Sequence, residues 1–186
     1  MATKNNRRIL VTKRILRESL MELMQEKPIS KITIKEICDL SEMSRSTFYL
    51  HYQDQFELLS DVENEVMENT LKALENLSGS FNTTESIEAF LEYVKENKET
   101  FGILLCQPDT EDFQKTIIET IANNVKAAVP EILDNKNADY LFTFVMYGSL
   151  NVLRVWIQSG FDTPTRDLAE LIYQSCNNVA KSSAAS

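Results

Sequence analysis

The sequence is poor in glycine and proline, with only four of each among its 186 residues. These two residues are the commonest breakers of helices and the commonest formers of tight turns. Between them lie long stretches rich in leucine, glutamate, lysine and methionine, all of which favour helix. A fold of many short strands needs more turns than this chain can supply, so the composition predicts an all-α protein.

Residues suited to metal binding and nucleophilic catalysis are also scarce. The chain has one histidine, His51, and three widely separated cysteines, Cys38, Cys106 and Cys176. An odd number of separated thiols forms neither a disulfide framework nor a CxxC metal site. No glycine-rich phosphate loop accompanies them. We therefore expect free thiols, no catalytic residues, no metal, no cofactor and no enzymatic activity.

Long apolar runs are absent as well. No stretch approaches the roughly 20 consecutive apolar residues that a membrane-spanning helix needs. The basic N-terminus is not followed by the unbroken apolar segment of a secretory signal. We therefore expect a cytoplasmic protein with no membrane partner.

Positive charge is concentrated at one end of the chain. Residues 1–52 carry ten Lys/Arg against six Asp/Glu, a net charge of +4, whereas residues 53–186 carry nine against 22, a net of −13. A basic end on an acidic body predicts a polyanionic partner for that end. The alternative is a basic segment that is only solvated, and the motifs downstream decide between the two.

The basic segment is predicted to be helical and is followed by a second, capped helix. An apolar stripe with helical spacing covers residues 7–26, and Lys27-Pro28 ends it. Beyond it, Thr33 and Glu36 have the spacing of a capping box, in which each side chain satisfies a backbone N–H of the other residue. This pattern predicts a short second helix over residues 33–40.

A third helix follows after a turn of only three residues. Ser44 is an N-cap residue for a helix over residues 44–51 that directs Phe48 inward. This spacing predicts a three-helix DNA-binding domain of the helix-turn-helix type over residues 1–53, with the third helix as the recognition helix. A fourth capped helix opens a helical domain over residues 54–186, which brings the expected total to about nine helices.

The sequence also resembles a known family. The segment IKEICDLSEMSRSTFYLHY at residues 34–52, with DQFELL at residues 54–59, resembles the TetR/AcrR-type bacterial regulators. Residues 144–160 are similar, less specifically, to the C-terminal domain of a subset of them. The resemblance implies a DNA-binding transcriptional regulator, more often a repressor, that dimerises through its last two helices. It also implies a variable helical domain that a small-molecule effector can occupy.

DNA recognition needs cations and donors that hold phosphates, and a few side chains that reach base edges. The resemblance places Thr33, Tyr49 and His51 at phosphates and residues 44–47 at the operator. Arg45 suits a bidentate contact to guanine, with a phosphate contact or solvation as the alternative. Tyr49 has the alternative of packing at the rim of the core. The candidate DNA-binding residues are Arg7, Arg8, Thr33, Lys35, Ser44, Arg45, Ser46, Thr47, Tyr49 and His51.

Two positions depart from the family pattern. Glu42 stands in the turn where the family usually has glycine, and Gln55 stands where it usually has lysine. Glu42 must therefore adopt a backbone conformation that glycine takes more easily, and the missing lysine removes a phosphate contact. We expect operator affinity to depend more on the N-terminal arginines. The departures also support an alternative function, a helical ligand-binding or protein-interaction module with weakened DNA binding.

The helix predicted over residues 137–159 is apolar nearly all round, so it needs cover on two sides. We expect its own domain to cover one side and a second subunit the other, and the alternative is a central helix of a monomeric bundle. A two-fold dimer presents two recognition helices about 34 Å apart, which predicts a palindromic operator in double-stranded DNA. The predicted dimer interface is Tyr147, Leu150, Ile157, Leu168, Leu171, Ile172, Ser175 and Val179.

The second domain also contains candidates for an effector pocket. Four aromatic residues, Tyr93, Phe101, Phe113 and Trp156, have the size and apolar character of pocket-lining side chains. The alternative is that they form ordinary core, which is the commoner fate of aromatic residues at helical spacing. The acidity of this domain favours a cationic or neutral effector.

Overall fold

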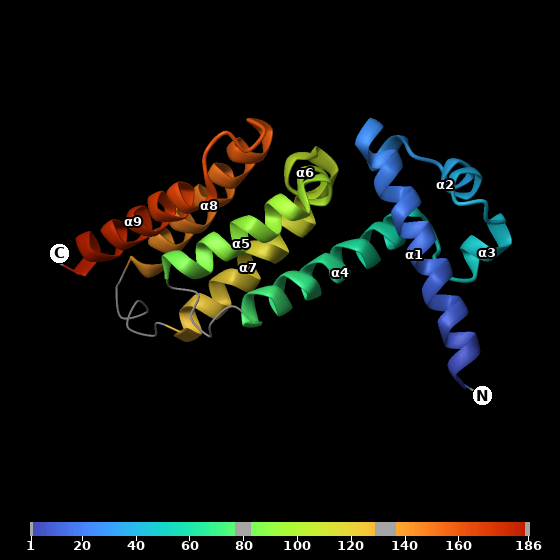
Figure 1. Cartoon of the computed structure of the whole chain (residues 1–186), viewed down its shortest axis with the longest axis horizontal. Helices are drawn as coiled ribbons and strands as arrows, with labels where there is room; N and C mark the ends of the chain where they lie inside the picture. The colour runs from blue at the N-terminus through green and yellow to red at the C-terminus, as the bar shows by residue number, and fades with distance from the viewer. Residues whose placement is uncertain (1, 77–82, 129–136, 185–186) are drawn as a thin grey trace. The chain divides into compact units, whose positions relative to one another are not determined.

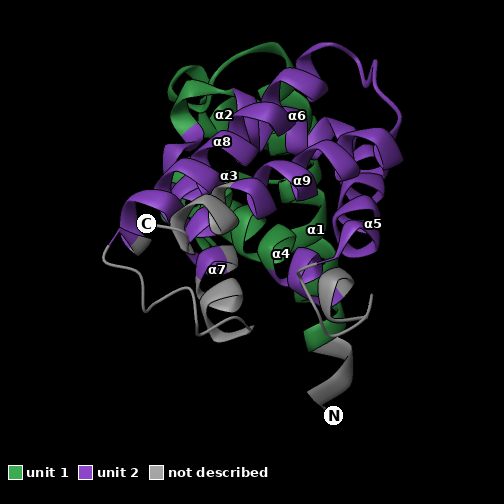
Figure 2. Cartoon of the chain, turned by 90° about the vertical axis from the view of Figure 1, so that its left-hand side faces the viewer, with its two compact units in different colours: residues 1–67, 107–109 green, residues 68–106, 110–186 purple. Residues whose placement is uncertain are grey.

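The computed structural model describes residues 2–76, 83–128 and 137–184. Within these ranges the chain forms nine α-helices and two short 3-10 helices and has no strand (Figure 1). The predicted all-α class is therefore confirmed. The chain divides into two compact units, which Figure 2 shows in different colours.

The first unit consists of residues 1–67 and residues 107–109. Its helices are α1 (Ala2–Glu26), the 3-10 helix η1 (Ile29–Lys31), α2 (Ile34–Leu40), α3 (Arg45–Tyr49) and the first half of α4 (Gln55–Asn76). The core of this unit is made of side chains with no exposed surface, including Leu16, Leu20 and Met24 of α1, Ile37 of α2 and Phe48 of α3. Three helices thus share one apolar centre, as a helix-turn-helix requires.

The first unit extends beyond the predicted boundary at residue 53. In the first half of α4, Leu58, Leu59 and Val62 are at most 5% exposed, so α4 contributes its own apolar stripe to this core. The turn at residues 107–109 also belongs here, because the Gln107 side-chain amide donates to the Met24 carbonyl at 2.5 Å.

The second unit consists of residues 68–106 and 110–186. Its helices are the rest of α4, α5 (Thr84–Glu96), α6 (Lys98–Cys106), α7 (Glu111–Ala128), α8 (Ala138–Gln158) and α9 (Thr165–Ala184), and the 3-10 helix η2 (Pro108–Thr110) leads into α7. Helix α9 packs against α5 and α8, while α8 also packs against α6 and α7 (Figure 1). Helix α8 is therefore the central element of this unit.

Helix α8 buries only one of its two apolar faces. Leu153 and Trp156 are 5% and 2% exposed, whereas Tyr140, Phe144 and Val155 are 79%, 69% and 64% exposed. Over Asp139–Gln158 the mean hydropathy is 1.3, so by length and composition alone α8 could cross a membrane. The expectation that no stretch meets that test was therefore wrong. The same test is passed by helices of globular proteins that need apolar cover on two sides.

Candidate nucleic-acid interface

Side-chain caps hold the turn between α2 and α3. The hydroxyl of Thr33 accepts from the Glu36 N–H at 3.3 Å, and the Glu36 carboxylate accepts from the Thr33 N–H at 2.9 Å. At α3 the Ser44 hydroxyl accepts from the Thr47 N–H at 3.1 Å. Both predicted caps are thereby confirmed, with Thr33 and Ser44 lying just outside the helices that they begin.

The turn itself contains the strained backbone that the family resemblance implied. Glu42 has a φ of 54°, in the left-handed region that glycine adopts without steric cost. The next residue closes the turn, since the Met43 N–H donates to the Cys38 carbonyl at 3.0 Å. Glu42 therefore occupies a glycine conformation without being glycine, and its side chain is exposed.

Helix α3 presents a polar outer face because its inner face is anchored by Phe48, which has no exposed surface. Arg45, Ser46 and Tyr49 are exposed, and Thr47 is half-buried. The Tyr49 side chain is 58% exposed even though its ring lies 5.7 Å, edge-on, from that of Phe48. These side chains are free to meet a surface placed against α3.

Leu50 is a member of this outer face that the sequence reasoning missed. Its N–H donates to the Ser46 carbonyl at 3.2 Å, so it continues the helical path one turn after Ser46. Its side chain is 80% exposed. The four-residue spacing from Ser46 was the available signal, because it puts both residues opposite the buried Phe48.

Several cations of the first unit are paired with carboxylates of the same unit. Lys13 and Arg17 are paired with Asp61, at 3.4 and 3.0 Å. Arg14 contacts Glu18 at 3.7 Å, and Lys35 contacts Asp39 at 3.5 Å. By contrast, Arg7, Arg8 and Arg45 are exposed and make no ion pair with the described residues. The cations available to a polyanion are therefore fewer than the sequence indicates.

One of the predicted phosphate contacts, Thr33, is already engaged locally. The Thr33 hydroxyl donates to the Glu36 carboxylate at 2.8 Å, and Lys27 binds the same carboxylate at 2.6 Å. The bonds from Lys27 and Thr33 lower the pKa of Glu36 to about 2, so the capping box stays charged across the physiological range. His51 is half-buried, with its ring 6.4 Å from that of Tyr52.

An acidic hub fixes α4 to α1 and to the end of the helix-turn-helix. The Tyr52 hydroxyl donates to Asp61 at 2.6 Å, and Arg17 and Lys13 approach the same carboxylate. Arg17 also contacts Glu65 at 2.9 Å. Partial burial raises the pKa of Asp61, but the bonds from Tyr52 and Arg17 and the charge of Lys13 outweigh it and lower the pKa overall.

The predicted dimer interface falls into two groups of residues. Exposed or half-buried are Tyr147, Ile157, Leu171, Ile172 and Ser175. Leu150 and Leu168 are only 8% and 5% exposed because they pack inside their own unit, so neither is available to a partner. The side chain of Val179 lies outside the described residues.

The structure places other apolar residues where a partner could reach them. Tyr140, Phe144, Tyr147 and Val155 of α8 lie on one exposed side, and Leu171 of α9 is 57% exposed. We call these five residues the α8–α9 face. Phe144 and Val155 are exposed although neither is among the predicted interface residues.

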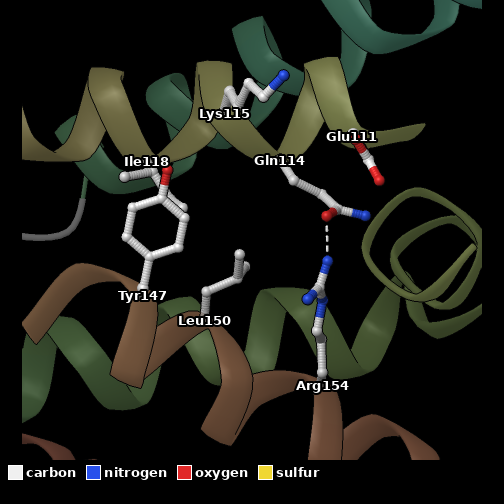
Figure 3. A pocket seen from close by; sticks show the side chains of 7 residues that line it. All are labelled: Glu111, Gln114, Lys115, Ile118, Tyr147, Leu150 and Arg154. Atoms are coloured by element: carbon white, nitrogen blue, oxygen red, sulfur yellow. Dashed lines mark hydrogen bonds between the residues drawn. The ribbon is translucent and has the colours of Figure 1, made fainter. Parts of the chain in front are cut away.

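The four aromatic residues proposed for a pocket form core contacts instead. Phe101, Phe113 and Trp156 are at most 2% exposed, and Tyr93 packs edge-on against Phe101 at 5.7 Å. None of them lines the cavity of about 270 Å³ that lies between α7 and α8 (Figure 3). That cavity is lined by Glu111, Gln114, Lys115, Ile118, Tyr147, Leu150 and Arg154.

Comparison with known proteins adds a family to this geometry. Residues 82–178 match the family model TetR_C_8, which describes a transcriptional regulator C-terminal region. The matched residues cover half of the chain and lie entirely outside the helix-turn-helix. The family signal therefore comes from the second unit, independently of the motif from which the resemblance was first drawn.

Two relatives are bacterial regulators. The HTH-type transcriptional regulator YxbF of Bacillus subtilis (strain 168) is 24% identical over 144 residues, which is 71% of this chain and 38% of the relative. The dhaKLM operon transcriptional activator DhaS of Lactococcus lactis subsp. lactis (strain IL1403) is 27% identical over 95 residues, which is 50% of this chain and 49% of the relative. The chain thus spans half or less of the length of either relative.

A solved structure shares the fold over nearly the whole chain. The TetR transcriptional regulator of Streptococcus agalactiae 2603V superimposes with a TM-score of 0.72 at 20% identity, covering 95% of this chain and 99% of that one. The helices of this chain therefore share the fold of that regulator.

Proposed function

Because this chain belongs to the TetR family of transcriptional regulators, we propose that it represses transcription by binding a palindromic operator as a homodimer. The observation that carries the proposal is the exposed outer face of α3, held in place by the buried Phe48. Members of the family are regulators rather than enzymes. We expect the protein to act in the cytoplasm and to release its operator when a small-molecule effector binds the second unit.

Three exposed arginines support binding to DNA. Arg7 and Arg8 lie on α1 and Arg45 opens α3, and all three are free of ion pairs with the described residues. Phosphate neutralisation by such cations makes affinity depend steeply on salt. We expect operator binding to weaken strongly between about 50 and 200 mM salt. A Kd that does not change over this range would contradict the proposal.

The α8–α9 face supports a homodimer. Its five side chains are apolar or aromatic and are 47% to 79% exposed, which is costly for a face this large unless another surface covers it. A second copy of the same face is self-complementary under two-fold symmetry. The resulting pair carries two α3 helices, which matches the two half-sites of a palindrome.

Arg45→Ala is expected to change the sequence preference of the protein. We expect the operator recovered from a random DNA pool to lose its preference at one base pair per half-site, with affinity falling by about 5- to 150-fold. Arg8→Ala is the matched control, since it removes an equally exposed arginine from α1. It is expected to lower the affinity for all DNA sequences alike. The slope of log affinity against log salt concentration should fall by about the amount that one phosphate contact contributes. Indistinguishable selection profiles for the two variants would rule out a base contact by Arg45.

Leu50 is expected to read a thymine methyl group. An exposed apolar side chain on the outer face of α3 suits that methyl in the major groove. Replacing one operator thymine by deoxyuridine removes only the methyl, and we expect wild-type affinity to fall by about fourfold. Leu50→Ala is expected to bind thymine DNA about fourfold more weakly than the wild type does. On deoxyuridine DNA the variant and the wild type should bind with equal affinity.

Leu40→Ala provides the control for Leu50, because Leu40 is an exposed leucine, 40% accessible, on α2. We replace each operator thymine in turn by deoxyuridine and measure the affinity. Leu40→Ala should lose as much affinity on these replacements as the wild type does. If Leu50→Ala also loses as much affinity as the wild type at every thymine, Leu50 does not contact a methyl group.

The direction of regulation has its own test, because the relative DhaS is named an activator. For a repressor, deletion of the gene raises expression from a promoter that contains the selected operator, and for an activator it lowers expression.

The alternative function is a ligand-binding or protein-interaction module with weakened DNA binding, and it is supported by the departures from the family pattern at Glu42 and Gln55. Recovery of no enriched sequence from a random pool at low salt would favour it.

A further inference from the structure

The cavity of the second unit has one apolar end and one cationic end. Tyr147 and Arg154 both rise from α8 toward α7, seven residues apart, with Leu150 between them (Figure 3). Seven residues of helix span about 10 Å, so the two ends are separated by the length of a small molecule. From α7, Ile118 meets Tyr147 at one end and Gln114 meets Arg154 at the other.

Arg154 is held in place by neutral groups alone. Its Nε donates to the Leu105 carbonyl at 2.6 Å, one terminal nitrogen donates to the Gln114 side-chain oxygen, and the other lies 3.4 Å from the Asn151 oxygen. A guanidinium has five N–H donors, so these contacts engage three of them. No acidic side chain of the described residues lies within ion-pair distance of Arg154, which is half-buried.

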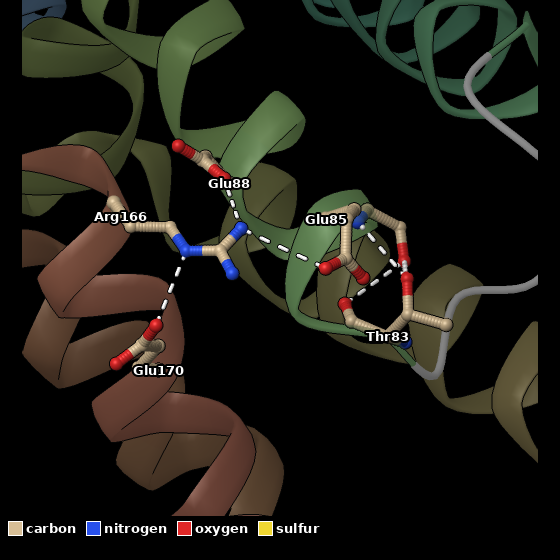
Figure 4. Close-up of polar contacts among 6 residues, drawn as sticks. Thr83, Glu85, Glu88, Arg166 and Glu170 are labelled. Carbon is tan, nitrogen blue, oxygen red and sulfur yellow. Dashed lines mark hydrogen bonds and ion pairs between the residues drawn. The ribbon is translucent and has the colours of Figure 1, made fainter.

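Arg166 of the same unit shows what an arginine with a purely structural role looks like. Its guanidinium contacts Glu88 at 2.8 Å, Glu170 at 3.1 Å and Glu85 at 3.6 Å, and so ties α9 to α5 (Figure 4). Three carboxylates surround that positive charge. In a unit as acidic as this one, the lack of any such partner at Arg154 needs another explanation.

We propose that this cavity binds a small amphiphilic carboxylate, which is the effector of the regulator. The carboxylate would accept from the remaining N–H donors of Arg154, a geometry that guanidinium groups favour. Lys115, 60% exposed and paired with Asp112 at 3.6 Å, lies at the rim with its side chain directed away from Arg154, so its positive charge acts on the ligand only at longer range (Figure 3). The apolar end of the ligand lies against Leu150 and Ile118, while Tyr147 at the edge of the cavity also belongs to the α8–α9 face.

The size and charge of the cavity narrow the ligand further. At about 270 Å³ it is slightly smaller than the roughly 300–1,000 Å³ of pockets for drug-sized ligands, so a short chain or single ring fits best. Its lining carries two cations and one acid, Glu111, whose exposed carboxylate makes no ion pair with Arg154. The overall acidity of the second unit had favoured a cationic or neutral ligand, and the local charges favour an anion.

Binding is tested on the full-length protein without DNA, using hexanoate and its uncharged analogue hexanamide as probes. Isothermal titration and thermal melting are run at matched ionic strength, with sodium chloride as the reference salt. We expect hexanoate to bind and to raise the melting temperature, and hexanamide to bind at least about tenfold more weakly. Absence of binding by hexanoate at millimolar concentration, or equal binding of the two probes, overturns the proposal.

Two variants locate the site. Arg154→Gln is expected to weaken hexanoate binding by about 10- to 100-fold and to leave hexanamide unchanged. Because this variant also loses a contact to α6, Lys115→Glu provides a second test at an exposed position that the fold does not need. It is expected to weaken hexanoate binding by about tenfold. Lys95→Glu, an equal charge reversal at an exposed position of α5, is the control and should leave binding intact.

The regulatory half of the inference rests on the proposed DNA-binding function and has a separate readout. We expect hexanoate to weaken binding to the selected operator in the wild type and in Lys95→Glu, and not in Lys115→Glu. Hexanoate binding without any effect on an operator that is bound tightly would exclude the effector role. If no operator is found, the titrations still decide whether the cavity binds a carboxylate.

Discussion

Replacing Phe144 by glutamate is expected to change the protein from a dimer into a monomer. Phe144 lies on the α8–α9 face and is 69% exposed in the single chain. In a two-fold dimer each substitution is present twice, so two phenylalanine contacts are lost together. Two glutamates are also brought toward the same apolar interface, where their charges lose water and repel each other.

The size of this effect follows from the buried area. Covering a phenylalanine side chain is worth about 1.5–3 kcal/mol, so two copies contribute about 3–6 kcal/mol, or about two to four orders of magnitude in the dimer Kd. Operator affinity depends on the dimer because both half-sites must be occupied at once. We therefore expect Phe144→Glu to bind the full palindrome no more tightly than a single half-site.

Sedimentation and gel-shift measurements check this prediction. The wild type should sediment at twice the subunit mass of 21.3 kDa, and Phe144→Glu at the subunit mass. Thr116→Glu adds the same charge to an exposed polar position of α7 and should remain dimeric. A Phe144→Glu protein that remains dimeric would show that the α8–α9 face is not the interface.

Local signals in the sequence were enough to predict the helix-turn-helix. Thr33 and Ser44 cap their helices as the spacing indicated, because a capping pattern involves neighbours three residues apart and depends little on the rest of the fold. The strain at Glu42 was expected from the family resemblance, because the family usually has glycine at this position. Sequence alone could therefore predict the helix-turn-helix that we propose to contact DNA.

Long-range packing could not be predicted in the same way. Helix α8 is apolar on two sides, so its sequence does not say which side faces its own unit. The structure buries Leu150 and Leu153 and exposes Phe144 and Val155, and this choice depends on where α6, α7 and α9 pack. Likewise, nothing near Arg154 in sequence indicates that it reaches the Leu105 carbonyl on α6.

The number of cations available to DNA could not be predicted either, because it depends on which cations pair with carboxylates that are distant in sequence. Lys13 and Arg17 looked like cations available to DNA, yet both are paired with Asp61, a residue of α4 that is distant in sequence. Only the packing of α4 on α1 brings them together. Asp61 thus pairs with two of the cations that the charge count had made available to DNA. The same ion pairs are expected to stabilise the first unit.

Asp61→Asn is expected to lower the free energy of unfolding of the first unit by about 2–3 kcal/mol. The substitution keeps the size of the side chain and removes its charge, which leaves Arg17 and Lys13 near a neutral amide. The Asp61 side chain is 29% exposed, so the loss is expected below the roughly 3–5 kcal/mol found for fully buried ion pairs. Tyr52→Phe, which removes only the hydroxyl bond to Asp61, should cost about 1 kcal/mol.

The pH dependence of this loss identifies its cause. The folded protein holds the pKa of Asp61 below the ordinary value, so the carboxylate contributes stability above the unfolded pKa near 4 and loses it as the pH falls through the folded pKa. Denaturant unfolding should therefore separate wild type from Asp61→Asn clearly near pH 6 and much less near pH 3. Asp39→Asn makes the same chemical change at an exposed ion pair with Lys35 and should cost less than about 1 kcal/mol. A constant difference between wild type and Asp61→Asn at both pH values would mean that the lost stability comes from packing and not from the charge.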